Sequence, residues 1–319
     1  MDIERAIVDL AYAIRRAVRP HLGKASSKNV TGKASSGDES FAIDEVAEKA
    51  VAEFIAHHNL PVAYYTEERG LVECACPEHL LVIDPIDGTR PAMVGLEGSV
   101  VSIALAPYSK EACLSDVTFG CVLELKEDRL LTAVRGGNVR ILEGETYQPV
   151  SLTLASDLDK MSWSFDIAGR PMELVAQVIG PMVNRSSLRG GVYIINSIAF
   201  CLTRLVTGQF DAVVDVSNRI LRDHPELRQQ FVESGLGTVI GLFPYDIAAA
   251  VLIAETAGCH VTDAYGNSLG DTPLLDTSEQ SIRSCVAASN PVLHERLLAE
   301  IERNCLSVMS DTREEKRGV

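Results

Sequence analysis

The chain of 319 residues has no uninterrupted apolar run long enough to cross a membrane, and it has no internal repeat or low-complexity stretch. A membrane-spanning helix needs about 20 mostly apolar residues, so the sequence predicts no membrane partner. Residues 1–22 place apolar side chains at helical spacing, but charged residues interrupt them. This pattern favours a core-packed amphipathic helix over a signal peptide or a membrane-surface helix. We therefore expect a cytoplasmic protein.

Basic residues are scarce relative to acidic ones. The 29 Lys and Arg residues stand against 44 Asp and Glu residues, which gives a formal net charge of −15. Nucleic acid polymers and anionic membranes bind basic surfaces, so neither is an expected partner. The overall charge also repels a small anionic ligand unless bound cations reverse the field locally. Such a ligand would depend on metal for its binding.

Eight cysteines are spread along the chain, and only Cys74 and Cys76 lie close together in sequence. A C-x-C pair without a second pair is weak support for zinc, and a long chain without a secretion signal favours reduced, buried thiols. A redox-regulated pair at Cys74 and Cys76 is the less favoured alternative.

One motif places two carboxylates at a predicted turn: Asp84-Pro85-Ile86-Asp87-Gly88-Thr89 follows the apolar run 80–83. The run predicts a buried strand, and the proline, which lacks a backbone N–H, is expected to end its pairing. Aspartate oxygens suit Mg²⁺, while the glycine allows close approach of a ligand. A helix beginning at Gly88 would present free N–H groups to a phosphate. For two aspartates alone, an acidic surface turn is an equal alternative.

Two further motifs place acids at the ends of predicted elements. Glu67 and Glu68 follow the β-branched and aromatic run 64–66, and Asp246 opens a predicted helix within residues 245–249. Side chains at element boundaries can project into a shared cleft, whereas acids within a helix usually face water. The three motifs together favour one acidic site.

Together these motifs resemble the inositol monophosphatase family of Mg²⁺-dependent, lithium-sensitive phosphatases, which includes fructose-1,6-bisphosphatases and 3'(2'),5'-bisphosphate nucleotidases. Residues 84–89 match the family's D-P-[IL]-D-G-T. Residues 245–249 and 255–259 resemble its W-D-x-A-A and E-A-G-G, with tyrosine in place of the tryptophan. Lys33 and Asp44 match a family lysine and a helix-opening aspartate. Separated matches in the family's order make the resemblance specific.

The resemblance implies that two to three Mg²⁺ ions bind at this site. The implied ligands are Glu67, Asp84, the Ile86 carbonyl, Asp87 and Asp246, with Asp84 shared by two ions. Glu67 would also contact a third, loosely held ion. Metal ions clamp the attacking and leaving oxygens and lower the pKa of a bound water. A His, Cys or Ser nucleophile is then unnecessary.

The resemblance also implies roles beside the metal ions. Thr89 and Asp44, with the ion held by Glu67, would activate the attacking water. Glu68 and Lys33 would support the ligands from outside. The segment 23–38, rich in Lys, Ser and Gly, would be a mobile flap, and composition alone favours a solvated loop.

Substrate binding is expected from Gly88 and Thr89 together with two imperfect matches in the second half of the chain. Ser197 lies in a segment similar to the family's G-S-A-A helix start. Asp215 ends a segment similar to D-A-x-x-E, whose acid contacts sugar hydroxyls. A helix cap for Ser197 and a solvated turn for Asp215 weigh equally.

Two departures from the family concern the substrate. Arg90 follows Thr89, where it would either reach a second phosphate or lie on the surface. An insertion over residues 216–243 carries a charged, predicted helical stretch over 221–233. Beside a pocket, the insertion would change the leaving group or form a subunit contact.

Consecutive strand-like runs, followed by runs that alternate between strand and helix patterns, predict an α+β fold. The family resemblance implies a layered α-β-α-β-α sandwich that forms a homodimer. We expect an N-terminal half (1–150) with most metal ligands, a C-terminal half (151–305) with Asp246 and the specificity residues, and a polar tail (306–319). Beyond the motif strand, we predict strands at 118–125, 130–134, 150–154, 161–165 and 210–214, and helices at 171–183 and 197–207.

Three functional hypotheses follow. The favoured one is a Mg²⁺-dependent phosphomonoesterase acting on an inositol phosphate or a related small sugar phosphate. A second keeps this chemistry but takes fructose-1,6-bisphosphate or a 3'(2'),5'-bisphosphate nucleotide. The third is a non-catalytic phosphosugar or metal sensor, which the intact ligand set disfavours.

Overall fold

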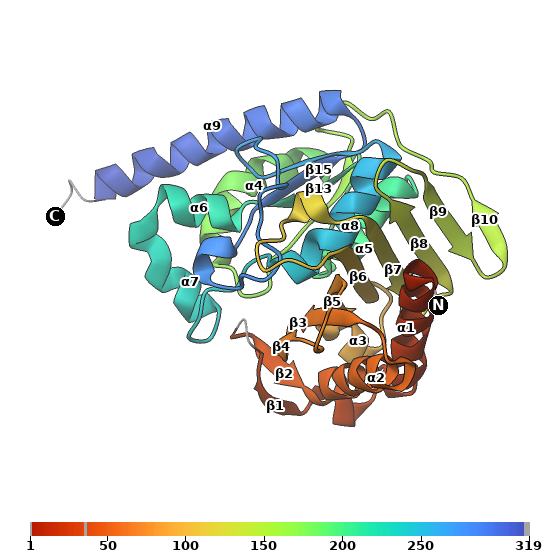
Figure 1. The fold of residues 1–319 in the computed structure, drawn as a ribbon. Helices are drawn as coiled ribbons and strands as arrows, with labels where there is room; N and C mark the ends of the chain where they lie inside the picture. Colours follow the sequence, from red (N-terminus) through yellow and green to blue (C-terminus); the bar gives the residue numbers. More distant parts are fainter. Residues whose placement is uncertain (1, 35–36, 316–319) are drawn as a thin grey trace.

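Two β-sheets lie on either side of a central pair of helices, and further helices cover the outer faces (Figure 1). The structure is a computed structural model that describes residues 2–34 and 37–315. The layers follow one another as helices, sheet, helices, sheet, helices. This order confirms the expected α+β sandwich of the α-β-α-β-α type.

The first sheet contains eight strands in the order β10-β9-β8-β7-β6-β5-β3-β4, with β3 and β5 parallel and the other pairs antiparallel. Helices α1 (Ile3–Val18) and α2 (Ala42–His58) pack on its outer face, which confirms the amphipathic opening helix as a core element. The strands are β3 (Val62–Thr66), β4 (Gly70–Val72), β5 (His79–Asp87), β6 (Val100–Pro107), β7 (Phe119–Glu124), β8 (Arg129–Val134), β9 (Val139–Glu143) and β10 (Thr146–Gln148).

The second sheet has five strands in the order β12-β11-β13-β15-β14, with β11 parallel to both β12 and β13. Helices α4 (Met172–Ser186) and α9 (Pro291–Glu315) pack against each other on its outer side. The strands are β11 (Ser162–Phe165), β12 (Gly191–Tyr193), β13 (Ala212–Asp215), β14 (His260–Thr262) and β15 (Cys285–Ala288).

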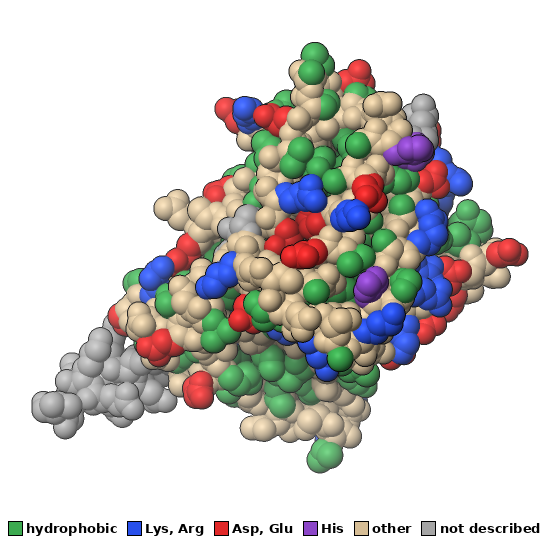
Figure 2. Space-filling model, turned by 90° about the horizontal axis from the view of Figure 1, so that it is seen from below, with side chains coloured by type: hydrophobic (Ala, Val, Ile, Leu, Met, Phe, Trp, Pro, Cys, Tyr) green, Lys and Arg blue, Asp and Glu red, His purple; other side chains and the backbone are tan. Residues whose placement is uncertain are grey.

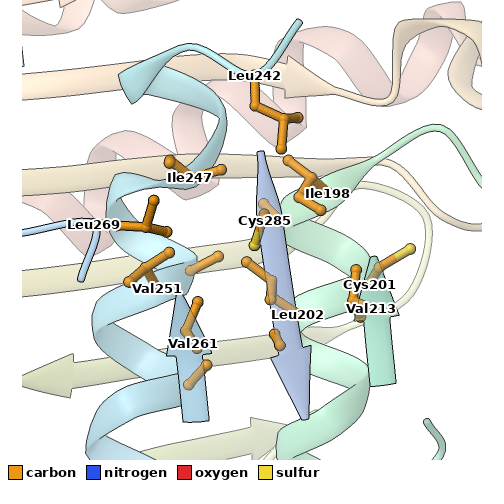
Figure 3. Close-up of a cluster of buried hydrophobic side chains, with 14 of the residues drawn as sticks. Ile198, Cys201, Leu202, Val213, Leu242, Ile247, Val251, Val261, Leu269 and Cys285 are labelled. Carbon is orange, nitrogen blue, oxygen red and sulfur yellow. The ribbon is translucent and has the colours of Figure 1, made fainter. Parts of the chain in front are cut away.

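Helices α5 (Ile198–Val206) and α8 (Pro244–Ala257) form the central layer. Figure 3 shows side chains from these helices, such as Leu202 and Val251, beside Cys285 on β15. Because both helices lie between two sheets, ten of the 14 residues of α8 are apolar and buried. This packing fixes the first residues of both helices against the end of β5.

Strand β5 continues through Pro85, so the expectation that proline ends its pairing is wrong. Asp84 pairs with Ser102 and Asp87 pairs with Val100, and the register shifts between these two positions. A bulge inserts unpaired residues while the ladder resumes beyond them, and a missing N–H is tolerated there. Helix α3 (Thr89–Val94) then begins directly after Gly88.

The other predicted elements are present with small shifts, except for the strand at 150–154. Residues 149–157 have no regular structure, and Leu154 is 90% exposed. Their alternating apolar pattern resembles a strand, but they lie in the connection between the two sheets. The division of the chain into halves near residue 150 stays a prediction.

The insertion 216–243 folds into α6 (Ser217–Asp223), a 3₁₀ turn at Pro225–Leu227 and α7 (Arg228–Ser234). The segment expected as an irregular loop contains β1 (Val30–Lys33), which pairs with β2 (Glu39–Phe41). Helix α9 extends to Glu315 into the expected polar tail, whose residues 316–319 lie outside the described residues. Every described helix is too short or too polar to span a bilayer.

Candidate active site

Three aspartates, two from β5 and one from α8, meet at the end of β5. One carboxylate oxygen from each of Asp84, Asp87 and Asp246 lies within 4.8 Å of the others. Asp84 and Asp87 come from the two sides of the β5 bulge, and Asp246 lies in the first turn of α8. The bulge and the central helix together therefore create the cluster.

Asp87 is oriented by the beginning of α5. The Ser197 hydroxyl donates to Asp87 Oδ2 at 2.7 Å, and the Ala199 N–H donates to the same oxygen at 2.7 Å. Both partners are buried, so the carboxylate is held against the helix N-terminus. Its other oxygen is left for the cluster.

Asp246 and Asp44 occupy equivalent positions in their helices. Each lies three residues after an N-terminal phenylalanine and accepts its backbone N–H: Phe243 N donates to Asp246 Oδ2 at 2.6 Å, and Phe41 N donates to Asp44 Oδ2 at 2.9 Å. Phenylalanine cannot cap a helix with its side chain, so the acid supplies an acceptor at the helix start.

Thr89 connects Asp44 to the motif. Its hydroxyl oxygen lies 3.1 Å from Asp44 Oδ1 and 3.2 Å from the Ile86 carbonyl oxygen. The hydroxyl has a single proton for these two acceptors. The structure thus brings together the threonine and the aspartate that the resemblance assigned to water activation.

Glu67 follows β3 and faces the same cluster. The hydroxyl of Tyr245 donates to Glu67 Oε1 at 3.5 Å, and the Tyr245 ring stacks on Tyr65 and Phe243. The tyrosine at the signature tryptophan position thus adds a polar contact to a predicted metal ligand. The next residue, Glu68, accepts a hydrogen bond from Ser40 instead.

The carboxylates of the cluster repel one another. Burial, and then the charges of neighbouring acids, raise the pKa of Glu67, Asp84 and Asp246 well above the ordinary range. Burial raises the pKa of Asp87 to about 7, and of Asp44 to about 7 as well. A bound cation would relieve this repulsion.

The donor set suits a hard divalent cation. The candidate ligands offer only oxygen atoms, which fit Mg²⁺ better than the softer metals that prefer Cys or His. The predicted ligands Glu67, Asp84, Ile86, Asp87 and Asp246 all line one cavity, together with Gly88 and Thr89. Asp44 and Glu68 line a smaller adjoining cavity, which also contacts Glu67 and Asp84.

Three predicted residues are placed differently. Ser197 is 1% exposed and contacts Asp87 rather than the cavity, because α5 begins directly behind that carboxylate. Asp215 is 2% exposed and binds Arg170, because β13 ends behind the loop that follows β11. Lys33 contacts the insertion, with Nζ 3.4 Å from the Leu236 carbonyl oxygen.

The cavity lining contains residues that the sequence analysis missed. They come from the loop after β11, from the residue before Ser197 and from the insertion: Asp166, Ala168, Arg170, Asn196, Ile240, Gly241, Leu242 and Phe243. Only Asp166 carried a usable signal, since it directly follows the predicted strand 161–165, as Asp84 follows its own strand.

Charged residues also border the cavity. Arg90 lies at its edge, with its side chain 44% exposed and Nη2 3.2 Å from Asp38 Oδ1. Figure 2 shows acidic side chains gathered near the middle of one face, with Lys and Arg side chains around them. Positively charged side chains therefore lie near the acidic cluster, although the net charge of the chain is negative.

Comparison with known proteins relates the whole chain to phosphatases. It is 27% identical over 305 residues to a fructose-1,6-bisphosphatase/inositol-1-monophosphatase of Methanothermobacter thermautotrophicus, covering 92% of this chain and 95% of the relative. It is 23% identical over 297 residues to an inositol-1-monophosphatase of Mesorhizobium japonicum, and the match covers 93% of this chain and 95% of the relative. Both relatives are named as phosphatases.

Solved structures share the fold. An extragenic suppressor protein from Bartonella henselae superimposes with a TM-score of 0.70 at 18% identity, covering 94% of this chain and 98% of the other. A protein from Pyrococcus horikoshii with similarities to inositol-1 monophosphatase superimposes with a TM-score of 0.66 at 23% identity, and the match covers 93% of this chain and 96% of the other. The sequence model of the inositol monophosphatase family matches residues 2–305. By this match, the chain belongs to the inositol monophosphatase family.

Proposed function

We propose that this protein is a Mg²⁺-dependent phosphomonoesterase that hydrolyses an inositol phosphate or a related small sugar phosphate with water as the nucleophile. The observation that carries this proposal is the cluster of Asp84, Asp87 and Asp246, whose oxygens lie within 4.8 Å of one another. The names of the relatives agree with a phosphatase acting on sugar or inositol phosphates.

Two Mg²⁺ positions share Asp84 in this proposal. Glu67, Asp84 and the Ile86 carbonyl would hold one ion, Asp84, Asp87 and Asp246 would hold another, and Glu67 would contact a third. When bound, the ions would neutralise charge on the phosphoryl oxygens and lower the pKa of water. The ligand set fits because its buried carboxylates repel one another, and a bound cation would offset that repulsion.

Thr89 and Asp44 orient the attacking water, and Asp44 receives its proton. The Thr89 hydroxyl lies 3.1 Å from Asp44 Oδ1 and 3.2 Å from the Ile86 carbonyl oxygen, which places it beside the carboxylate that acts as the base. A bond forms between the water oxygen and phosphorus, the ester P–O bond breaks, and inorganic phosphate and an alcohol are released. The described lining contains no Cys, His or Ser that would compete as a nucleophile.

A second candidate function is bisphosphate hydrolysis. Arg90 at the cavity edge could contact a second phosphate, and several relatives are named fructose-1,6-bisphosphatases. A 3'(2'),5'-bisphosphate nucleotide is the other bisphosphate alternative. A non-catalytic sensor is less favoured, because such a protein need not keep the whole ligand set.

Further expectations rest on the family resemblance. We propose that the protein is a lithium-sensitive homodimer of the cytoplasm, without a nucleic acid polymer or a membrane as partner. The net charge of −15 supports the last point.

Phosphate release from a substrate panel tests the proposal. The panel comprises inositol 1-phosphate, sugar monophosphates, fructose 1,6-bisphosphate and 3'-phosphoadenosine 5'-phosphate, each with Mg²⁺ and with chelator. We expect chelator-sensitive release from inositol 1-phosphate or a sugar monophosphate. Turnover of either bisphosphate alone would support the second candidate function, and silence across the panel would contradict an esterase role.

A further inference from the structure

Asp215, expected to contact sugar hydroxyls, is already fully engaged. Arg170 Nε and Nη2 donate to Asp215 Oδ2 at 3.1 and 2.6 Å, and the Ser217 backbone N–H donates to Oδ1 at 2.8 Å. The side chain is 1% exposed and lies outside the cavity lining. A substrate hydroxyl therefore has no access to this carboxylate.

Asp166 offers the free acceptor that Asp215 does not. It follows β11, is only 8% exposed and lines the same cavity as the metal-ligand cluster. Across residues 2–34 and 37–315, no hydrogen bond or ion pair within 4.0 Å ends on its carboxylate. Buried carboxylates are normally bonded, so an unpartnered one facing a cavity indicates a ligand that supplies the donor.

The charged groups around Asp166 show where a ligand bound to it would lie relative to the metal-ligand cluster. The positive charge of Arg170 and the negative charge of Asp215 act on it, and burial has the larger effect, raising the pKa of Asp166 to about 6. Its negative charge in turn helps to raise the pKa of Asp87. Asp166 is thus close to the metal-ligand cluster, and a group bound to it would lie near the phosphate.

An ionised carboxylate accepts hydrogen bonds but donates none, so a ligand that binds it through hydrogen bonds must be a donor. Arg170 is fixed by Asp215 and by the Ala168 carbonyl, 2.6 Å from Nη1, so it does not turn to Asp166. We propose that Asp166 accepts hydrogen bonds from hydroxyl groups of the substrate. Resting on the proposed function, this makes Asp166 a specificity-determining residue that favours an ester with a hydroxyl close to the phosphate.

The test compares esters with and without hydroxyl groups in Asp166→Asn and Asp166→Ala. Inositol 1-phosphate and fructose 1,6-bisphosphate carry hydroxyls, whereas p-nitrophenyl phosphate carries none. For each protein, kcat/KM for the better of the two hydroxylated esters is divided by kcat/KM for p-nitrophenyl phosphate. We expect this ratio to be about tenfold or more lower in the Asp166 variants than in the wild type, which is the scale of a hydrogen bond to a charged group. Asp211→Asn is the matched control, because Asp211 is also 8% exposed but bonds to Thr153 and Ser162.

Thermal unfolding of the metal-free protein gives a second readout. Asp166→Asn should raise Tm, because it removes an unpartnered buried charge, whereas Asp211→Asn should lower Tm by breaking existing hydrogen bonds. An unchanged ratio in the Asp166 variants, an equal fall in the control, or a lower Tm for Asp166→Asn would overturn this inference. Absence of turnover of every ester by the wild-type protein would instead contradict the proposed function, and this inference with it.

Discussion

The hydroxyl of Ser197 lies 2.7 Å from Asp87 Oδ2, so the first turn of α5 holds a carboxylate that ends β5, 110 residues earlier in the chain. The same hydroxyl accepts the Phe200 N–H at 3.4 Å. The Ser197 side chain therefore both caps α5 and orients Asp87, a candidate metal ligand.

Ser197→Ala should weaken Mg²⁺ binding and also lower the stability of the fold. Loss of a partner that orients a ligand typically lowers metal affinity about 10–100-fold, and loss of the cap costs about 1 kcal/mol. The Mg²⁺ concentration for half-maximal activity and the free energy of unfolding in urea measure the two effects.

Ser186→Ala is the control for this prediction. Ser186 is also fully buried and accepts the Trp163 Nε1–H at 2.8 Å, but it lies on α4. It should lose stability while keeping the Mg²⁺ requirement. Equal Mg²⁺ requirements in both variants would show that Ser197 does not orient the ligand.

Asp87→Asn and Asp246→Asn should remove turnover without unfolding the protein. Each loses a charged ligand at the cavity, and loss of one preorganised electrostatic contact in an active site lowers kcat about 10²–10³-fold. Phosphate release measures activity, and circular dichroism measures folding. Normal Mg²⁺-dependent activity in both variants would rule out this site.

Gly88→Ala should destabilise the turn between β5 and α3 strongly. Gly88 has φ +88°, and an added Cβ would lie 2.7 Å from the Gly98 carbonyl oxygen and 2.9 Å from Ser197 Cβ. The left-handed conformation alone costs an L-residue about 1–2 kcal/mol, and the two close contacts add to this cost. Urea unfolding of the purified variant measures the total.

Gly136→Ala separates the two contributions. Gly136 has φ +73°, but an added Cβ would meet no atom within 4 Å. The Gly136→Ala variant should therefore lose only the free energy that the left-handed conformation costs. Equal destabilisation by the two variants would contradict steric crowding at Gly88.

The metal-free protein should become more stable as the pH falls from about 8 to about 5. The pKa values of Asp44 and Asp87 are raised to about 7, and those of Glu67, Asp84 and Asp246 are raised well above the ordinary range. The folded protein binds more protons than the unfolded chain between the unfolded pKa near 4 and these raised values, so stability decreases with rising pH.

Mg²⁺ should reverse this trend, because a bound cation stabilises the ionised carboxylates. Tm measured against pH with EDTA and with Mg²⁺ checks both signs, and about 1 kcal/mol corresponds to roughly 2–4 °C for a large domain. A Tm in EDTA that rises with pH, or no stabilisation by Mg²⁺ at pH 8, would contradict repulsion within the cluster.

The sequence by itself located the metal-ligand candidates, because each lies at the end of a strand or at the start of a helix that local patterns define. Asp84, Asp87, Glu67 and Asp246 could be found this way, and the resemblance supplied their grouping. The layered sandwich followed from the same resemblance.

Only the tertiary structure decided the partners of the remaining side chains. Local pattern does not specify which distant element lies opposite a side chain, so Ser197 turned to Asp87, and Asp215 bound Arg170 rather than facing the cavity. The same limit applies to 150–154, where an alternating pattern had no neighbouring strand to pair with. Asp166 became a candidate ligand-binding residue because packing buries it beside the cluster without a hydrogen-bond donor of its own.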